Sequence, residues 1–351
     1  MKVPTRYKVS GNSIGGGMGD IHACIDTHLE RKVVFKVLKA GQETRRLFDE
    51  QKALLQIRSK HVVQLYDIVE IDTDGQIGQA LVLEYIEGSP LKFGEFVADV
   101  RLLHVLWQVS CGLSEIHKAR VIHRDIKPAN IMLDSSGVIK ILDFGLSRNK
   151  GEDAHTVSRI GTPAFMAPEL WGTQDISFDQ KIDIYSFAIT AISLLKGGRI
   201  PKELTEYPPG QIKSGALESI FSGFPLDVIN ILESCLDREP NCRPSSFEIE
   251  GVLKKYLLEG KHRALLVAGD KVHELHRASP QANITISPLG SIGIKYTGTE
   301  FVVVSCSGSV TVNNSPIADG MSLPGCCVLT FGVGRYRQFI TFNVSNPEVM
   351  S

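Results

Sequence analysis

A cluster of glycines near the N-terminus is the first feature of the chain whose residue types and spacing suit the binding of a phosphate group. Gly15, Gly16, Gly17 and Gly19 lie between two segments that read as strands, so they predict a hairpin. Backbone N–H groups in such a hairpin can approach the oxygens of a triphosphate, because no Cβ atom stands in the way. Glycines also form ordinary turns, so this loop alone is a weak indication of a nucleotide site.

A lysine and a glutamate downstream add the charges that a phosphate site needs. Lys36 ends the apolar run Val33–Phe35, and Glu50 lies in a segment, 43–57, whose apolar residues have helical spacing. A lysine in such a place is often only an edge residue. The spacing to the glycine loop and to Glu50 favours instead a pair that anchors the α- and β-phosphates, with Glu43 as the second choice of partner.

Three polar motifs follow in order along the chain. His123–Asn130 reads HRDIKPAN, Asp143–Gly145 reads DFG, and Ala167–Glu169 reads APE. With these motifs the sequence resembles the eukaryotic-like, or Hanks-type, serine/threonine protein kinases. The resemblance covers about residues 7–258 and is specific, because three motifs rarely occur together in this order by chance.

The resemblance implies a reaction and a role for each polar residue in it. The reaction is transfer of the γ-phosphate of ATP, with Mg²⁺ or Mn²⁺, to serine or threonine hydroxyls of protein substrates, and autophosphorylation is expected. Asp125 would accept the proton of the acceptor hydroxyl, and Lys127 would neutralise the transferring phosphoryl group. Asn130 and Asp143 would hold the metal. Lys127 together with Thr162 in the substrate loop matches the family's Ser/Thr pattern rather than its Tyr pattern.

The same resemblance implies structural roles for residues around these groups. His123 and Phe144 would pack together beneath the metal-binding aspartate, and Glu169 would form an ion pair with Arg243. Asp183 would brace the backbone of the turn that precedes the catalytic aspartate.

The resemblance also places the nucleotide. Adenine would bond to the backbone of the hinge near Glu84 and Ile86, between apolar walls formed by Ile21, Val34 and Met132. Taken one at a time, residues of these types more often belong to an ordinary protein core than to a nucleotide site. The expectation therefore depends on their positions in the family pattern.

The glycine loop departs from the family's usual G-x-G-x-x-G spacing. Counting back from Gly19 puts Gly16 in the second glycine position and Ile14 in the first. Either Ile14 replaces the first glycine or the loop is one residue short. In both cases we expect the tip of the hairpin to cover the phosphates.

The loop between the DFG and APE motifs contains two candidate phosphorylation sites, Thr156 and Ser158. A phosphate on either residue could pair with Arg124 or Arg148 and order the loop. The alternative is that both are ordinary solvated loop residues.

The elements that must position these residues follow from the apolar pattern. Strand character dominates up to about residue 85 and helical character follows, which predicts a β-rich N-lobe of about 1–85 and a helical C-lobe of about 86–260. This is the α+β bilobal protein kinase fold. Helices are expected at 43–57, 95–118, 180–196 and 226–258.

Residues 261–351 predict a separate, small all-β sandwich. The run 308–342 is similar to the last strands of forkhead-associated domains, which bind phosphothreonine peptides. The Gly-Arg and Ser-x-x-His residues that read the phosphate in that family are not found. We therefore expect a regulatory or docking domain with its own partner rather than a phosphopeptide reader. Strands are expected at 265–267, 284–287, 292–296, 301–305, 310–313, 327–331 and 339–344.

Composition narrows the function classes further. The net charge of −1 gives no general attraction to nucleic acid, and the longest apolar run, 182–195, contains Asp183 and Ser186 and is too short for a membrane span. Seven cysteines without a C-x-x-C pair argue against a zinc site and favour a reducing compartment. We therefore expect a cytoplasmic protein.

Two rival functions remain. A pseudokinase scaffold that signals by binding alone draws support from the altered glycine loop, but the intact Lys36, Asp125 and Asp143 count against it. A small-molecule phosphotransferase of kinase-like fold is disfavoured by the Ala167–Glu169 motif and the loop at Thr162, which shape a peptide groove.

Overall fold

The computed structural model shows two compact units, residues 1–253 and 254–350, which are described separately. The division falls within helix α5 (Ser246–Leu257), shortly before residue 260, where the sequence placed it. The predicted domain limits, 1–260 and 261–351, stay a prediction. The structure describes residues 1–11, 14–15, 20–37, 44–73, 75–146, 148–149, 162–172, 179–198, 200–268, 271–345 and 349.

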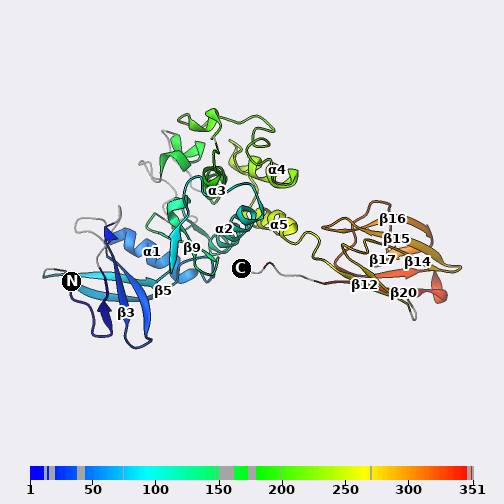
Figure 1. The fold of residues 1–351 in the computed structure, drawn as a ribbon, viewed down its shortest axis with the longest axis horizontal. Helices are drawn as coiled ribbons and strands as arrows, with labels where there is room; N and C mark the ends of the chain where they lie inside the picture. The colour runs from blue at the N-terminus through cyan, green and yellow to red at the C-terminus, as the bar shows by residue number, and fades with distance from the viewer. Residues whose placement is uncertain are drawn as a thin grey trace. The chain divides into compact units, whose positions relative to one another are not determined.

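The first unit begins with an antiparallel sheet in the order β1–β3–β4–β6–β5 (Figure 1). In β4, Val33 and Phe35 point into the core of this sheet, as residues two apart on a strand must. Lys36 therefore points to the opposite face, where helix α1 lies beside the sheet. The elements are β1 (Tyr7–Val9), β3 (Asp20–Asp26), β4 (Arg31–Val37), α1 (Thr44–Gln56), β5 (Leu65–Thr73) and β6 (Gln76–Glu84), with the short β2 (Ile14–Gly15) paired to β3.

Helices dominate the rest of this unit. The helix α3 (Lys181–Leu194) is buried on all sides from Ile182 onward, as expected for a helix that is apolar all round. The other helices are α2 (Val100–Lys118) and α4 (Leu226–Ser234), with short 3₁₀ turns η1 (Pro128–Asn130), η2 (Pro163–Phe165), η3 (Pro168–Trp171), η4 (Lys202–Thr205) and η5 (Pro240–Cys242).

Two helix predictions need correction. The helix expected at 95–118 begins only at Val100, because the Asp99 carboxylate accepts hydrogen bonds from Arg101 N and Leu102 N and so caps its start. The segment expected to be helical at 226–258 holds α4 and α5, which are separated by η5, where Pro240 interrupts the pattern.

Short strands frame the polar motifs. The HRD segment lies between β8 (Val121–Ile122) and β9 (Ile131–Asp134), and the DFG segment follows β10 (Ile139–Ile141). Strand β9 pairs with β10 and with β7 (Gly88–Pro90), while β8 pairs with β11 (Arg148–Asn149). These pairings bring the two motifs next to each other.

Both tryptophans of the chain lie in this unit. Trp107 sits on α2, with its ring 6.2 Å from the ring of His61 and 5.6 Å from that of His104. Trp171 ends η3 and packs against Tyr207, with the ring centroids 4.7 Å apart and the rings tilted by 34°.

The second unit consists of two antiparallel sheets that share one hydrophobic core. The first has the order β13–β12–β20–β19–β17–β18 and the second the order β14–β15–β16. The sequence missed β13 and β18, since β13 carries charged residues and β18 is two residues long. The strands are β12 (Ala264–Ala268), β13 (Lys271–Leu275), β14 (Gln281–Ile286), β15 (Gly290–Tyr296), β16 (Phe301–Gly308), β17 (Val310–Val312), β18 (Ser315–Pro316), β19 (Cys326–Phe331) and β20 (Gln338–Val344), with a 3₁₀ turn η6 (Gly334–Tyr336).

Among the described residues, no helix has the length and apolar character that crossing a membrane requires.

Candidate active site

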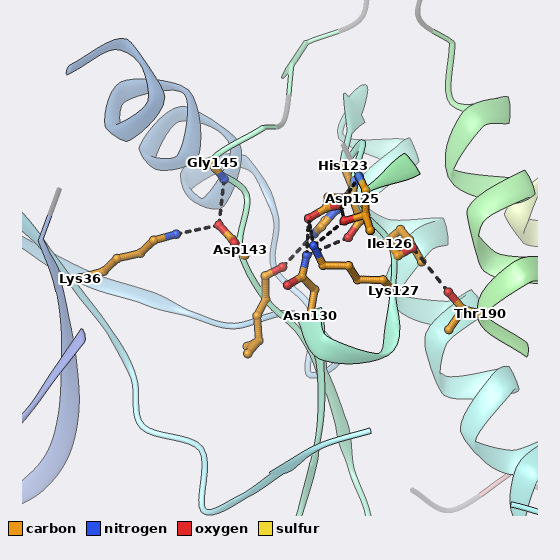
Figure 2. Close-up of polar contacts among 11 residues, drawn as sticks. Lys36, His123, Asp125, Ile126, Lys127, Asn130, Asp143, Gly145 and Thr190 are labelled. Atoms are coloured by element: carbon orange, nitrogen blue, oxygen red, sulfur yellow. Dashed lines mark hydrogen bonds and ion pairs between the residues drawn. The ribbon is translucent and has the colours of Figure 1, made fainter. Parts of the chain in front are cut away.

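A buried lysine links the two lobes of the first unit. Lys36 Nζ donates to both carboxylate oxygens of Glu50, at 2.8 and 2.7 Å. It also donates to Asp143 Oδ1 at 2.8 Å (Figure 2). The three residues come from β4, from α1 and from the segment after β10. The structure thus brings together the lysine and glutamate that the sequence paired and adds the aspartate of the DFG motif.

Charge, rather than shape alone, holds this cluster. Burial alone would lower the pKa of Lys36, but the carboxylates of Glu50 and Asp143 raise it well above its usual value. Burial would raise the pKa of Asp143, but Lys36 outweighs burial and lowers it. Complete burial raises the pKa of Glu50, and the Lys36 ammonium opposes that rise. The lysine ammonium is therefore the group on which the cluster depends.

A second polar cluster surrounds Asp125. Lys127 Nζ lies 2.6 Å from Asp125 Oδ2, and Asn130 Nδ2 donates to that oxygen at 2.9 Å. Thr162 Oγ1 donates to Asp125 Oδ1 at 2.9 Å, and Lys127 Nζ donates to Thr162 Oγ1 at 2.7 Å. One carboxylate oxygen therefore faces a cation and an amide, while the other already accepts a threonine hydroxyl.

A buried carboxylate beneath this loop fixes its backbone. Asp183 on α3 accepts from His123 N at 2.9 Å and from Arg124 N at 2.8 Å. Arg124 has φ of 72° and Asp143 has φ of 61°, a left-handed conformation that is uncommon for residues with a Cβ. Such strain persists only where neighbouring contacts over-determine the backbone, and it gathers at functional sites. Burial also lowers the pKa of Arg124 to about 10.

A histidine that the sequence did not single out completes this support. His117, near the end of α2, lies with Nε2 at 2.9 Å from Asp183 Oδ2 and with Nδ1 at 3.2 Å from Ser246 Oγ of α5. Contact with His117 helps to lower the pKa of Asp183 against the effect of burial. His117 lies six residues before His123, and no spacing rule links a residue at that position to the catalytic motif.

The structure brings together two further expected pairs, His123 with Phe144 and Glu169 with Arg243, and adds two contacts that the sequence did not predict. The rings of His123 and Phe144 meet edge to face at 4.8 Å, and His123 Nε2 lies 2.8 Å from Leu142 O. The fully buried guanidinium of Arg243 forms a bidentate ion pair with the Glu169 carboxylate, to which it donates hydrogen bonds of 2.7 and 2.8 Å. Thr190 of α3 donates to the carbonyl of Ile126 at 3.4 Å (Figure 2).

The expected adenine region joins strands from both lobes. Val34 pairs with Leu83 next to the hinge, and Met132 pairs with Pro90. The side chains of Val34, Ile86 and Met132 are half-buried and that of Ile21 is exposed, so none of the four is sealed into the core. The side chain of Glu84 forms an ion pair with Lys140 at 2.7 Å, a contact that the sequence did not predict.

Several expected residues lie outside the described residues. These are Gly16, Gly17 and Gly19 of the glycine loop and the candidate phosphosites Thr156 and Ser158. Of the glycine loop, the backbone of Ile14 and Gly15 is described, and Ile14 pairs with Ile21 of β3.

The residues present suit a divalent cation bound together with a phosphate chain. Asn130 uses its amide nitrogen in its bonds to Asp125, so its carbonyl oxygen is the atom left for a metal, and Asp143 supplies a carboxylate. In the described part of the chain, no group of three or more His, Cys, Asp or Glu side chains forms a metal site. A cation here would therefore complete its shell with phosphate oxygens and water, as magnesium commonly does.

Comparison with known proteins agrees with this geometry. Residues 9–256 match the family model described as "Protein kinase domain". The chain is 31% identical over 211 residues to the probable serine/threonine-protein kinase PknB of Bifidobacterium longum, which covers 55% of this chain and 30% of that protein. It is 30% identical over 213 residues to the serine/threonine-protein kinase PrkC of Bacillus subtilis (57% and 32%), and 29% identical over 266 residues to the serine/threonine-protein kinase PksC of Streptomyces coelicolor (69% and 47%).

The matched stretches span less than half the length of each of these three relatives. The family model, in contrast, covers well over half of this chain and includes every residue of the two polar clusters. The chain therefore belongs to the protein kinase family.

Proposed function

We propose that the chain is a serine/threonine protein kinase that transfers the γ-phosphate of ATP, with Mg²⁺, to hydroxyls of protein substrates. The observation that carries the proposal is the bond from Thr162 Oγ1 to Asp125 Oδ1 at 2.9 Å, with Lys127 Nζ bonded to both residues. The Asp125 carboxylate thus already accepts a bond from a threonine hydroxyl, and an acceptor hydroxyl would donate the same kind of bond.

The two clusters would have different roles in the transfer: the first would bind the phosphates and the second would act on the acceptor hydroxyl. Lys36, held by Glu50, would bind the α- and β-phosphates and orient them. The acceptor oxygen forms its bond to the γ-phosphorus while the bond from that phosphorus to the β,γ-bridging oxygen breaks. The hydroxyl proton passes to Asp125, and Lys127 offsets the negative charge of the moving group.

Asp143 and Asn130 would hold the magnesium ion, and Mn²⁺ has the ligand preferences to replace it. When bound, the metal would offset part of the negative charge of the phosphates. The Lys36–Asp143 bond of 2.8 Å places this carboxylate beside the phosphate anchor.

The proposal is tested by incubating the purified chain with labelled ATP, Mg²⁺ and generic protein acceptors, and then mapping the phosphorylated residues. We expect phosphoserine and phosphothreonine on the acceptors and on the chain itself, and a loss of at least about 1,000-fold in Asp125→Asn. Binding of ATP without any transfer would indicate a scaffold instead, and transfer only to small molecules would indicate a small-molecule phosphotransferase.

We also propose that a phosphate on Thr156 or Ser158 activates the enzyme. Support comes from Arg124, a buried guanidinium next to the catalytic aspartate whose pKa burial lowers to about 10, so an added negative charge nearby would stabilise its charged form. The activities of Thr156→Ala, Ser158→Ala and the double variant are compared with the phosphatase-treated protein. Full activity in all of them, with no phosphate on either residue, would contradict the proposal.

The finer assignments of the second unit and of location are also proposals. Its two sheets around one core, together with the forkhead-associated-like run, favour a regulatory or docking module. All seven cysteines lie in described residues and none takes part in a disulfide, which favours a reducing compartment and hence the cytoplasm.

A further inference from the structure

An exposed aromatic side chain stands close to the substrate loop. Phe93 lies between β7 and α2 with 68% of its surface exposed. Its ring centroid is 6.4 Å from that of Phe165, and the two rings are tilted by 44°. Single exposed apolar residues are common, so exposure alone assigns no role to Phe93.

The backbone on both sides of Phe93 is fixed, so the ring is presented from a rigid support. Leu91 N donates to Ile131 O at 2.9 Å, and Gly94 N donates to Ser193 O at 3.0 Å. The side chains of Leu91 and Phe96 are buried on either side. Gly94 has φ of 67°, the left-handed turn that directs the chain back into the core after the exposed ring.

A short series of contacts connects Phe93 to the catalytic carboxylate. Phe165 is 6% exposed, and its carbonyl accepts from Ser186 Oγ at 2.7 Å, which anchors it to α3. Phe165 N donates to Thr162 O at 2.9 Å, and Thr162 Oγ1 donates to Asp125. An extended peptide advances about 3.3 Å per residue, so an acceptor peptide bound at Asp125 reaches Phe93 with a side chain a few residues from its hydroxyl.

The surroundings favour an apolar rather than a basic side chain at this point. Ala129 on η1, an element that neighbours β7, is exposed and adds an apolar side chain without charge to the catalytic loop. The nearest carboxylate on that segment, Glu95, accepts from Lys92 N at 3.1 Å, and Lys92 adds a positive charge of its own. The positive charge of Lys92 would therefore disfavour a basic peptide side chain beside Phe93, whereas the exposed ring offers apolar contact area.

We infer that Phe93 is a specificity-determining residue that selects protein substrates with a bulky apolar side chain at one fixed position near the acceptor serine or threonine. The inference rests on the proposed kinase activity and names its substrate class. A single apolar contact of this size changes kcat/KM by about tenfold between a leucine and a serine side chain.

The test uses the full chain and peptide sets that keep the acceptor constant and vary one flanking position at a time. We expect the wild type to prefer leucine, methionine or phenylalanine over serine and lysine by about tenfold at one position. Phe93→Ser should reduce this ratio to about twofold or less. Phe93→Glu should shift the preference towards arginine or lysine at the same position.

Phe247→Ser is the matched control, because Phe247 on α5 is also a phenylalanine with most of its surface exposed, at 74%. It should keep the wild-type profile. An unchanged ratio in both Phe93 variants, or a wild type with no apolar preference, overturns the inference. Absence of transfer to every peptide and protein, including the chain itself, would instead refute the proposed kinase activity.

Discussion

The phosphate-anchoring cluster and the catalytic loop hold their charged groups in different ways. Lys36, Glu50 and Asp143 come from three separate elements and are joined to one another by side-chain ion pairs. Asp125 lies in a loop whose backbone is bonded to Asp183, a carboxylate that is fully buried in α3. The first arrangement can be broken by moving one element, whereas the second requires the core of the C-lobe to open.

The largest expected effect is on catalysis at the cluster held by charge. In Asp143→Asn the side chain keeps its shape but loses the charge that faces Lys36 and the metal. We expect phosphate transfer to fall by about 1,000-fold or more, since metal binding and positioning supply most of the rate enhancement. The measurement is the initial rate with labelled ATP, and the thermal unfolding curve of the variant controls for folding. A rate within about tenfold of the wild type would contradict the assignment.

The second prediction compares stability in the two regions. Asp183→Ala leaves two buried N–H groups and His117 without their acceptor, so we expect a loss of about 3–5 kcal/mol in the free energy of unfolding. Glu50→Gln leaves Lys36 its bond to Asp143, so we expect a loss of about 1–2 kcal/mol. Urea unfolding of the three proteins measures both. Equal losses would show that the two regions are held in the same way.

The third prediction uses pH to separate charged from neutral buried groups. His61 is almost fully buried beside β10, and burial lowers its pKa to about 4, from about 6.5 in the unfolded chain. The unfolded chain therefore binds the extra proton first, and stability present above pH 6.5 is lost as the pH falls towards 4, by about 3 kcal/mol in total.

Lys36 and Asp143 of the charged cluster should contribute no acid sensitivity over the same range. The lowered pKa of Asp143 keeps its stabilising charge until the pH falls below the unfolded value of about 4, and the raised pKa of Lys36 keeps its charge up to at least the unfolded value of about 10.4. Unfolding free energies from pH 7 to pH 4 should thus fall less steeply in His61→Gln than in the wild type. Identical slopes would mean that another group causes the acid sensitivity.

The smallest expected effect concerns the second unit. Because the sequence lacks the residues that read phosphate in forkhead-associated domains, we expect matched phosphothreonine and threonine peptides to bind the full chain with affinities within about twofold of each other. Calorimetric titration in the presence of saturating ATP analogue measures the difference. A large preference for the phosphorylated peptide would show that this unit reads phosphate through other residues.

The sequence predicted best those contacts whose residues belong to contiguous motifs. The ion pairs of Lys36 with Glu50 and of Glu169 with Arg243 were expected as pairs, and the structure brings both together. Lys36 and Glu50 lie 14 residues apart, and their spacing already favoured the pair. Glu169 and Arg243 lie 74 residues apart, so only the family resemblance indicated that they would meet.

Contacts between ordinary-looking residues were not predictable. His117 lies on an amphipathic helix, and Lys140 lies in a short apolar strand, and neither position has a spacing rule that links it to Asp183 or Glu84. The start of α2 was also placed too early, because the apolar pattern continues through Phe96 and Val97 and only the Asp99 cap marks the boundary.

The placement of Trp107 and Trp171 has a practical consequence for anyone who unfolds this protein. Residues 254–350 contain no tryptophan, so indole fluorescence follows the first unit alone, whereas far-ultraviolet circular dichroism reports on both units. If the two signals change at different denaturant concentrations, the units unfold separately, and a single two-state fit would be invalid. Comparing both signals in one sample therefore assigns a mutational loss to its own unit without cutting the chain.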